Sequence, residues 1–321
     1  MNFSIRHPGS LIVILALTAA RSFACDVCGC AMPNHPWEPR AGLFLGVAEQ
    51  FTRFNTIQVD GREIDNDADQ YLDSSITQVF LGYNFTRALG LQLNVPLIHR
   101  AFRRTAGDRI ETGDESGVGD ISLLAHFAPV QIERGDFTFH WKLTGGVKLP
   151  TGSSDRLREE EEEGAEEEGG LPASGIHGHD IALGSGSVDG IVGTSFFMRK
   201  QRAFFSAEVQ YAIRSRGDHS YRFANDFSWR AGPGFYLKQD TDITFGVQFV
   251  CSGETKGKDK FRGARAEDTA LTAVYLGPKF IGAWKDKLSV DVGLDIPVMI
   301  DNSALQSVPD YRVRAMVSWA F

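Results

Sequence analysis

The chain has 321 residues, of which 42% are hydrophobic and 34 are glycine, and its formal net charge is -8. Beyond the N-terminus no apolar stretch is long enough to cross a bilayer as a helix, which excludes a helical membrane protein. The negative charge argues against a nucleic-acid partner, whose phosphates require a basic surface. The length permits one large all-β domain or two ordinary domains.

Residues 1–24 have the organisation of a secretory signal peptide. Arg6 and His7 precede the apolar run LIVILALTAA, and the small residues Ser22 and Ala24 occupy the cleavage positions. We therefore expect cleavage after Ala24 and export from the cytoplasm. A lipoprotein site would require leucine where this chain has Ser22, so acylation of Cys25 is disfavoured but stays open.

The mature chain is expected to start with a periplasmic segment, residues 25–40, that contains Cys25, Cys28, Cys30 and His35. Thiolates at this C-x-x-C-x-C spacing, together with an imidazole, suit Cu or Zn, because short loops let the sulfur atoms converge. In an oxidising compartment the simpler interpretation is one disulfide, from Cys25 to Cys28 or Cys30, with one cysteine left over. Both interpretations stay open.

From residue 41 onward, apolar and polar residues alternate in about twelve segments, the pattern of β-strands with one apolar face. In residues 137–149, for example, Phe139 faces one way and His140 the other. Cys251 falls on an apolar face and is interpreted as a small buried hydrophobe. The clearest segments are residues 76–85, 89–97, 137–149, 203–213, 242–251, 287–298 and 311–321, and weaker ones start near residues 42, 117, 181, 225 and 269.

The connections between these segments alternate between long and short, as in residues 150–180 against residues 199–202. An even number of strands with short periplasmic turns and long extracellular loops is typical of an outer-membrane β-barrel. Strands can cross lipid without unpaired backbone N–H and C=O groups only if they form a closed barrel. The alternative is a soluble sandwich or lipocalin-like barrel. The signal peptide, the loop asymmetry and the charged, glycine-rich polar faces favour an all-β, antiparallel transmembrane barrel of about 12 strands over residues 41–321.

Three motifs carry a resemblance to a known family: GVGDISLLAHF at residues 117–127, GGVKLPTGSSD at 145–155 and LGSGSVDGIVG at 183–193. They resemble successive fold-and-turn motifs of the MetA-pathway phenol-degradation-like family of outer-membrane proteins, over roughly the middle third of the chain. The resemblance implies a barrel that carries hydrophobic or aromatic compounds inward. Tyr311, Trp319 and Phe321 in the last strand likewise resemble the signal that the barrel assembly machinery reads. The cysteine-rich start and an acidic insertion depart from the family pattern.

That insertion lies in the long extracellular loop predicted at residues 150–180, where residues 159–163 and 166–168 are all glutamate. A block of like charges in a glycine-rich segment cannot form a core, so we expect a mobile, solvated loop. The string HGHD that follows supplies His177, His179 and Asp180, which together suit a divalent cation. The carboxylates of the loop suit Ca or Mg bridging to lipopolysaccharide.

The polar strand faces are expected to line the barrel interior, where opposite charges either plug the lumen or leave a narrow path. The predicted lining consists of His140, Lys142, Glu208, Arg230, Asp291, Asp295, Arg312 and Arg314.

No catalytic signature such as G-x-S-x-G, H-E-x-x-H or a phosphate-binding loop is present, so we expect a protein that is not an enzyme. The favoured function is porin-like: passive passage of small hydrophobic or aromatic solutes across the outer membrane of a Gram-negative bacterium, without a cofactor. The expected partners are lipid, lipopolysaccharide and the assembly machinery. The alternative is a metal-binding or partner-binding protein in which the barrel anchors the cysteine segment.

Overall fold

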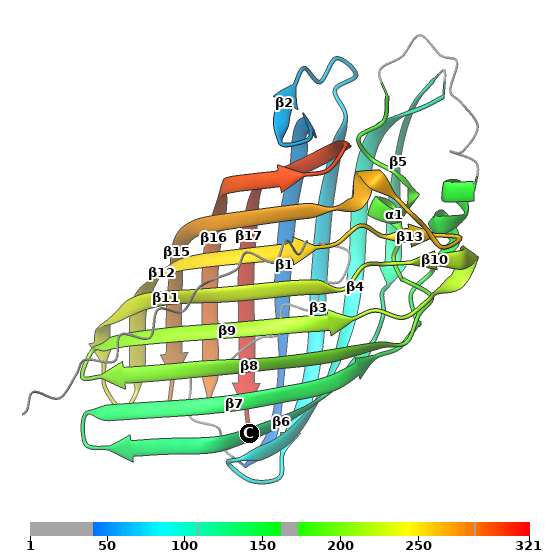
Figure 1. Ribbon diagram of the computed structural model, residues 1–321. Helices are drawn as coiled ribbons and strands as arrows, with labels where there is room; N and C mark the ends of the chain where they lie inside the picture. The colour runs from blue at the N-terminus through cyan, green and yellow to red at the C-terminus, as the bar shows by residue number, and fades with distance from the viewer. Residues whose placement is uncertain (1–40, 108, 162–172, 286) are drawn as a thin grey trace, which may run out of the picture.

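The computed structural model describes residues 41–107, 109–161, 173–285 and 287–321. Twelve long antiparallel strands form a closed barrel (Figure 1). They are β1 (Gly42–Val59), β3 (Tyr71–Asn84), β4 (Leu89–Ala106), β6 (Ser122–Arg134), β7 (Phe137–Lys148), β8 (Asp189–Lys200), β9 (Ala203–Ile213), β11 (Asp226–Gln239), β12 (Ile243–Lys256), β15 (Leu271–Trp284), β16 (Leu288–Asn302) and β17 (Leu305–Ala320).

The first and last barrel strands close the sheet. β1 pairs with β17 from Phe44 opposite Ala320 to Val59 opposite Leu305, and each remaining barrel strand pairs with its neighbours along the chain. Closure leaves the barrel without a free sheet edge at this seam. The prediction of an antiparallel barrel of about twelve strands is therefore confirmed.

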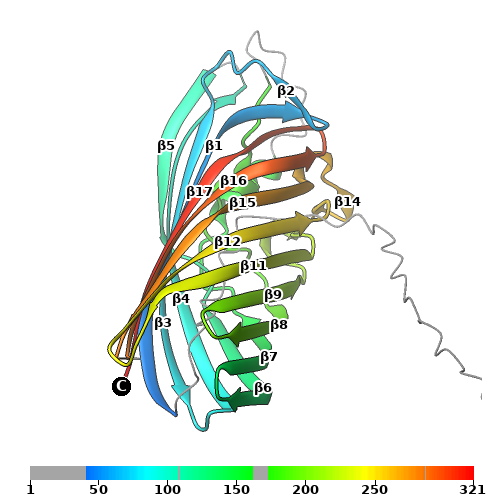
Figure 2. The same cartoon turned by 90° about the vertical axis from the view of Figure 1, so that its left-hand side faces the viewer.

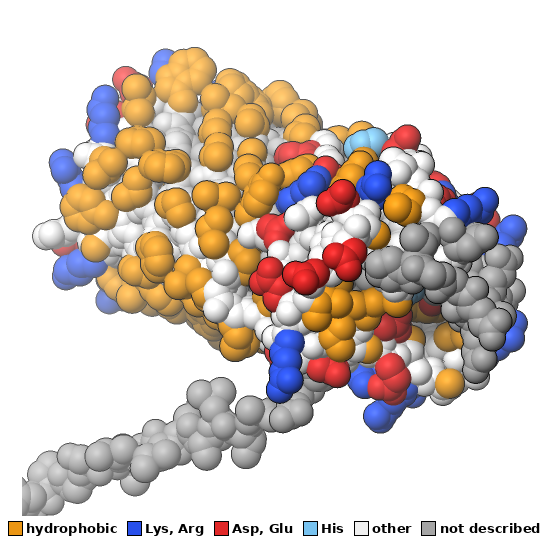
Figure 3. All heavy atoms as spheres, turned by 90° about the horizontal axis from the view of Figure 1, so that it is seen from above, with side chains coloured by type: hydrophobic (Ala, Val, Ile, Leu, Met, Phe, Trp, Pro, Cys, Tyr) orange, Lys and Arg blue, Asp and Glu red, His pale blue; other side chains and the backbone are white. Residues whose placement is uncertain are grey.

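Side chains alternate between the outer and inner surfaces of the wall. In β3, Val79 and Leu81 are exposed, whereas Ile76, Gln78 and Phe80 are buried. Large apolar side chains lie on the outside in most barrel strands, and Figure 3 shows them covering the wall. A water-soluble barrel has the opposite arrangement, so this outer surface matches a lipid environment.

The two ends of the barrel differ, and we name them by their connections. At the short-turn end, brief turns join β3 to β4, β6 to β7, β8 to β9, β11 to β12 and β15 to β16. Turn residues Gly135 and Gln201 there adopt positive φ angles of 58° and 55°. Both ends of the described chain also lie here, since the Phe321 amide donates to the Leu43 carbonyl oxygen at 3.0 Å.

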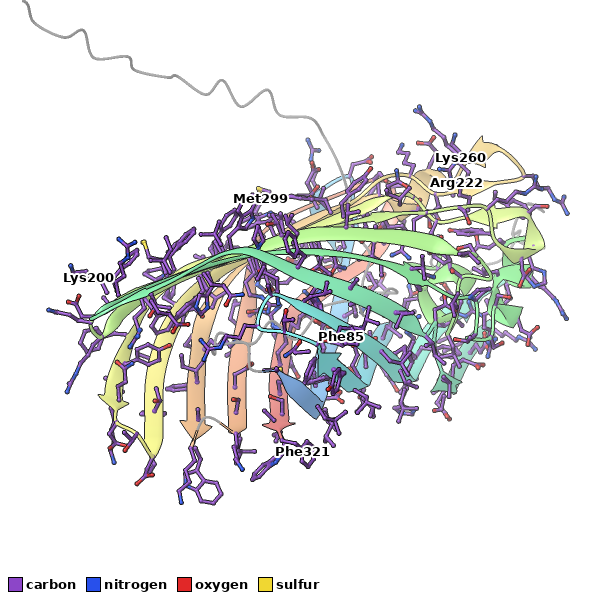
Figure 4. All side chains as sticks on the ribbon, turned by 90° about the horizontal axis from the view of Figure 1, so that it is seen from below. Phe85, Lys200, Arg222, Lys260, Met299 and Phe321 are labelled. Atoms are coloured by element: carbon purple, nitrogen blue, oxygen red, sulfur yellow. The ribbon has the colours of Figure 1, made fainter. Side chains whose placement is uncertain are left out.

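The long-loop end carries the remaining elements, away from the C-terminus in Figures 1 and 2. Figure 4 shows Lys200 at one end of the barrel, with Arg222 and Lys260 at the other. Among the described residues, no helix has both the length and the apolar character needed to span a bilayer. The smaller elements are β2 (Arg62–Ile64), β5 (Arg109–Val118), β10 (Tyr221–Arg222), β13 (Lys260–Phe261), β14 (Ala264–Arg265), α1 (Gly178–Ile181) and the 3-10 helices η2 (Asp155–Glu161), η3 (Asp218–Ser220) and η4 (Glu267–Thr269).

Two predicted strand starts were misplaced. The segment expected from Gly117 begins instead at Ser122, because Gly117 belongs to β5, which pairs with the upper part of β4. The segment expected from Ile181 begins at Asp189, because Ile181 ends α1. In both places an apolar alternation continues through a connection that folds against the barrel, so the pattern by itself does not mark the boundary.

Candidate functional site

A cavity of about 210 Å³ occupies the lumen at the short-turn end. It extends from the turn residues Arg87 and Lys287 into the barrel. Its apolar wall includes Ile281 and four inward-facing phenylalanines, Phe44, Phe80, Phe197 and Phe204. Space of this kind, lined by aromatic rings with a few polar groups, suits a small organic ligand.

Three of these rings lie over glycines on neighbouring strands. A Cβ atom on Gly82 would lie 2.1 Å from the Phe44 ring, one on Gly234 would lie 2.1 Å from the Phe204 ring, and Gly46 faces Phe80 in the same way. The glycines therefore let the rings rest against the wall of the lumen instead of projecting across it. Pairs of this kind also stabilise a glycine in a strand by covering it.

The cavity has an excess of positive charge. Its lining includes the carboxylate of Glu208 and five cationic side chains, those of Arg87, Lys142, Arg230, Lys279 and Lys287. Arg230 lies 3.3 Å from Glu208, and Lys279 lies 3.3 Å from Asp291 on the next strand. A concave site whose lining carries mostly one sign of charge concentrates solutes of the opposite charge.

Farther into the barrel, ion pairs connect neighbouring strands. Arg312 donates to Glu254 at 2.6 Å and to the Thr52 hydroxyl at 3.2 Å, and its guanidinium lies 4.6 Å from the Tyr275 ring centre. Arg314 forms an ion pair with Asp295.

The structure thus divides the predicted lining residues into two groups. His140, Lys142, Glu208 and Arg230 line the cavity, whereas Asp291, Asp295, Arg312 and Arg314 take part in ion pairs between strands. The ring of His140 lies 3.4 Å from Glu133.

The connection between β7 and β8 folds into the long-loop half of the lumen. We call its described residues 153–161 and 173–184 the plug segment. Leu183 packs against Ile76 and Ile98, which face the barrel interior. Ile176 and Ile181 pack in the same way against a cluster of inward-facing apolar side chains on β1, β3 and β4, namely Phe54, Leu72 and Phe102.

Polar contacts hold the plug segment to the wall on two sides. Arg100, which is 1% exposed, donates to the carbonyl oxygens of Asp180 at 2.6 Å and Ala182 at 2.7 Å. On β17 the Ser307 amide donates to the Gly175 carbonyl oxygen at 2.7 Å. The expectation of a solvated loop was wrong for residues 174–184, because they are buried or half-buried against the inner wall.

A buried network of charged groups holds both ends of the plug segment to the wall. Lys148 contacts Asp120 and Asp189, the latter at 2.9 Å, and Asp189 also accepts from Arg214 at 2.9 Å. Asp120 additionally accepts the backbone amides of Gly152 and Ser185, each at 3.0 Å. Sequence reasoning missed this network. The available signal was a charged residue inside each of the three glycine-containing motifs, namely Asp120, Lys148 and Asp189.

Those motifs meet in space. A Cβ atom on Gly184 would lie 2.5 Å from the Gly152 carbonyl oxygen, and one on Gly152 would lie 3.0 Å from the backbone of Gly119. Only glycine allows three backbone segments to approach this closely. The motifs that carry the family resemblance therefore build the junction where the plug segment leaves the wall.

The residues of the HGHD string lie together in the plug segment. His177, His179 and Asp180 present ligand atoms that all lie within 4.8 Å of one another. His179 is 2% exposed, and its Nδ1 lies 2.8 Å from Glu160. Burial opposes a charge on both groups, but Asp180 and Glu160 outweigh it and raise the pKa of His179 to about 10. The facing imidazole likewise lowers the pKa of Glu160 to about 2.

The other predicted sites lie on the outer face of the barrel, at the C-terminus or outside the described residues. Cys25, Cys28, Cys30 and His35 lie outside them, as does the predicted signal peptide. Cys251 is a free thiol on the outer apolar face and is half-buried rather than buried. Of the residues in the predicted assembly signal, Tyr311 points outward with its ring 6.1 Å from Phe51, Trp319 pairs with Leu45, and Phe321 is exposed.

The fold and the apolar outer surface define the class: an outer-membrane-type β-barrel. The COG4313 outer membrane channel from Pseudomonas putida F1 is similar in structure, with a TM-score of 0.64 and 15% identity over 90% of this chain and 99% of that chain. A Pseudomonas aeruginosa FadL homologue is more distant, with a TM-score of 0.36 and 8% identity over 88% of this chain and 90% of that chain. The CymD monoaromatic hydrocarbon channel has a TM-score of 0.37 and 6% identity over 88% of this chain and 89% of that chain. No family model and no curated protein matches the chain. The likeness shows the fold, and the family resemblance of the three motifs stays a prediction.

Proposed function

We propose that this protein is an outer-membrane channel for small apolar or aromatic molecules, and that it favours aromatic molecules that carry a negative charge. The observation that carries the proposal is the composition of the lumenal cavity, where four phenyl rings and five cationic side chains surround a space of about 210 Å³. The rings supply contact area for an aromatic solute, and the cations attract its acidic group.

The direction of the barrel follows from its connections. In outer-membrane barrels the short turns face the periplasm and the long loops face outward. The cavity then lies on the periplasmic side, and the plug segment closes the outer half of the lumen. A solute must pass the plug segment to reach the cavity, which favours a selective channel over an open, water-filled porin.

The fold shared with the COG4313 outer membrane channel supports a channel role, and the motif resemblance supports aromatic or hydrophobic solutes. The resemblance does not specify the charge of the solute. The preference for anions rests on the cavity residues of this chain, above all Lys142 and Arg230 with their neighbours.

Entry into liposomes that contain the purified protein tests the proposal. Three charged probes distinguish the effect of an aromatic ring on the rate of entry from the effect of charge. Benzenesulfonate has a ring and a negative charge, and trimethylphenylammonium has a ring and a positive charge. Methanesulfonate has a negative charge without a ring. None of them crosses plain lipid readily, because each carries a full charge. We expect benzenesulfonate to enter fastest.

Each alternative outcome has a distinct meaning. No protein-dependent entry of any probe would refute the channel. Equal entry of all three would refute an aromatic anion site and indicate a simple aqueous pore. Protein-free liposomes and liposomes with heat-denatured protein are the controls.

A further inference from the structure

We infer that a transition-metal ion, Zn(II) or an ion of similar chemistry, binds at a histidine cluster in the plug segment and fastens the plug segment to the loop before β15. The histidine cluster consists of His177, His179, Asp180, Glu160 and Asp268. This inference goes beyond the proposed function, because it concerns a separate site at the long-loop end.

Three short elements bring these side chains together. η2 supplies Glu160, α1 with its preceding residue supplies the histidines and Asp180, and η4 supplies Asp268. Gly178 separates the two histidines because a Cβ atom there would lie 2.3 Å from the Arg156 carbonyl oxygen of η2. The close packing of α1 on η2 therefore explains the spacing of the HGHD string.

The hydrogen bonds around His179 orient it as a metal ligand. Its Nδ1 lies 2.8 Å from Glu160, which leaves Nε2 facing Asp180 Oδ1 at 3.4 Å. A carboxylate on one ring nitrogen, with the metal on the other, is the usual arrangement around zinc-bound histidines. The other oxygen of Asp180 accepts the His177 amide at 3.0 Å, so that Oδ1 stays directed at the cluster.

His177 supplies the second imidazole. Its ring stacks on that of His179 with centres 5.6 Å apart. Its Nδ1 is buried, has no hydrogen-bond partner among the described residues, and lies 3.2 Å from Asp268 Oδ2. The buried nitrogen and the carboxylate lie side by side but form no hydrogen bond with each other. This arrangement is expected for two groups that bind the same cation.

The donor set favours zinc over calcium or magnesium. Two imidazole nitrogens and the carboxylates of Asp180 and Asp268 match the nitrogen and oxygen ligands of Zn(II), whereas Ca(II) and Mg(II) prefer oxygen alone. The first glutamate of the acidic tract is engaged elsewhere, since Glu159 pairs with Arg104 at 2.6 Å. An apolar shell that includes Leu157, Tyr221 and Phe223 surrounds the region and limits water.

Calorimetry on the full mature chain in detergent tests the inference. Cys25, Cys28 and Cys30 are replaced by serine so that only the histidine cluster is measured, and the protein is freed of metal with a chelator. We expect one Zn(II) per chain and no comparable binding of Ca(II). Co(II) in place of Zn(II) should give the absorption spectrum of a four-coordinate site.

Variants connect the binding to the cluster. His177→Ala and Asp268→Ala should abolish stoichiometric binding, and Glu160→Gln should weaken it by about 10- to 100-fold. His99→Ala is the matched control, because this histidine is exposed on β4 and contacts Ser116 rather than the cluster. Heat-modifiable migration on a gel shows that each variant is folded.

Either of two results would overturn the inference: no Zn(II) binding by the folded chain, or binding that His177→Ala and Asp268→Ala leave unchanged. The first result would show that His179 is only a buried imidazolium held by two carboxylates. The measurement needs no transport, so it fails or succeeds independently of the proposed channel.

Discussion

The backbone amide of Gly184 donates a hydrogen bond to the carbonyl oxygen of Ser153 at 2.8 Å, so the two ends of the plug segment meet. The described residues between them pack inside the lumen, and the chain rejoins the wall where it left it. The plug segment is therefore an insertion into a barrel whose strand pairing closes without it. This makes it possible to remove the plug segment and leave the barrel closed.

Replacing residues 155–182 by a short Gly-Ser link should convert the protein into an open pore. The deletion removes the side chains that fill the long-loop half of the lumen, such as Ile176 and Ile181, while Asp120 and Lys148 still anchor the junction. We expect steady ion conductance in planar bilayers that the intact protein lacks. A folded deletion variant with unchanged conductance would show that the plug segment does not close the lumen.

Gly82→Ala should narrow the cavity. The added methyl group would overlap the Phe44 ring, whose far edge is free to swing into the lumen. Overpacking by one methyl group costs about 1–3 kcal/mol of folding stability, and a ring displaced into the cavity should slow entry of benzenesulfonate by roughly tenfold. Gly293→Ala is the control, since its Cβ would meet only ordinary contacts at 3.6 Å or more and also faces inward. Equal rates for the two variants would contradict the prediction.

Lys142→Gln should reduce the preference for anions. The side chain lines the cavity, where charges interact strongly because the effective dielectric constant is low. Loss of its charge should therefore lower the ratio of benzenesulfonate to trimethylphenylammonium entry rates by roughly tenfold. Lys200→Gln is the matched control, because this lysine lies at the same end with 70% of its side chain exposed. A ratio that changes equally in both variants would exclude a specific role for the cavity.

Arg312→Met should destabilise the barrel. Its side chain is 5% exposed and pairs with Glu254, which is 13% exposed, so the substitution leaves a carboxylate in the lumen without this partner. Removing one partner of a buried ion pair lowers the free energy of unfolding by about 3–5 kcal/mol. Urea unfolding of protein in lipid vesicles measures the loss. Lys200→Met, which breaks an exposed contact to Asp136, should have little effect, and comparable losses would refute the prediction.

Much of the barrel follows from local patterns. The alternation in residues 137–149 and 203–213 predicted β7 and β9 closely, because a strand that separates lipid from lumen must carry opposite chemistry on successive residues. The same alternation indicated that His140, Lys142, Glu208 and Arg230 face inward together. These four residues, on the three strands β7, β9 and β11, reach one cavity only because the sheet closes.

The plug segment was interpreted incorrectly because its composition suggests solvent exposure. Glu159 and Glu160 belong to a run of glutamates, yet they contact Arg104 and His179. Arg104 is far away in the sequence, and no periodicity in residues 150–180 signals that its neighbours will meet the inner wall. Charge composition predicts solvation only when no partner of opposite charge lies nearby.

By itself, the sequence determined the number of strands, the surface that each strand turns outward and the ends of the barrel that carry short and long connections, because these depend on residues close together in the chain. Only the tertiary structure decided that the plug segment lies inside the lumen, that phenylalanines lie over glycines in a positively charged cavity, and that His177, His179 and Asp180 meet Glu160 and Asp268. Those relationships depend on closure of the sheet and on one connection folding inward, which bring together residues far apart in the sequence.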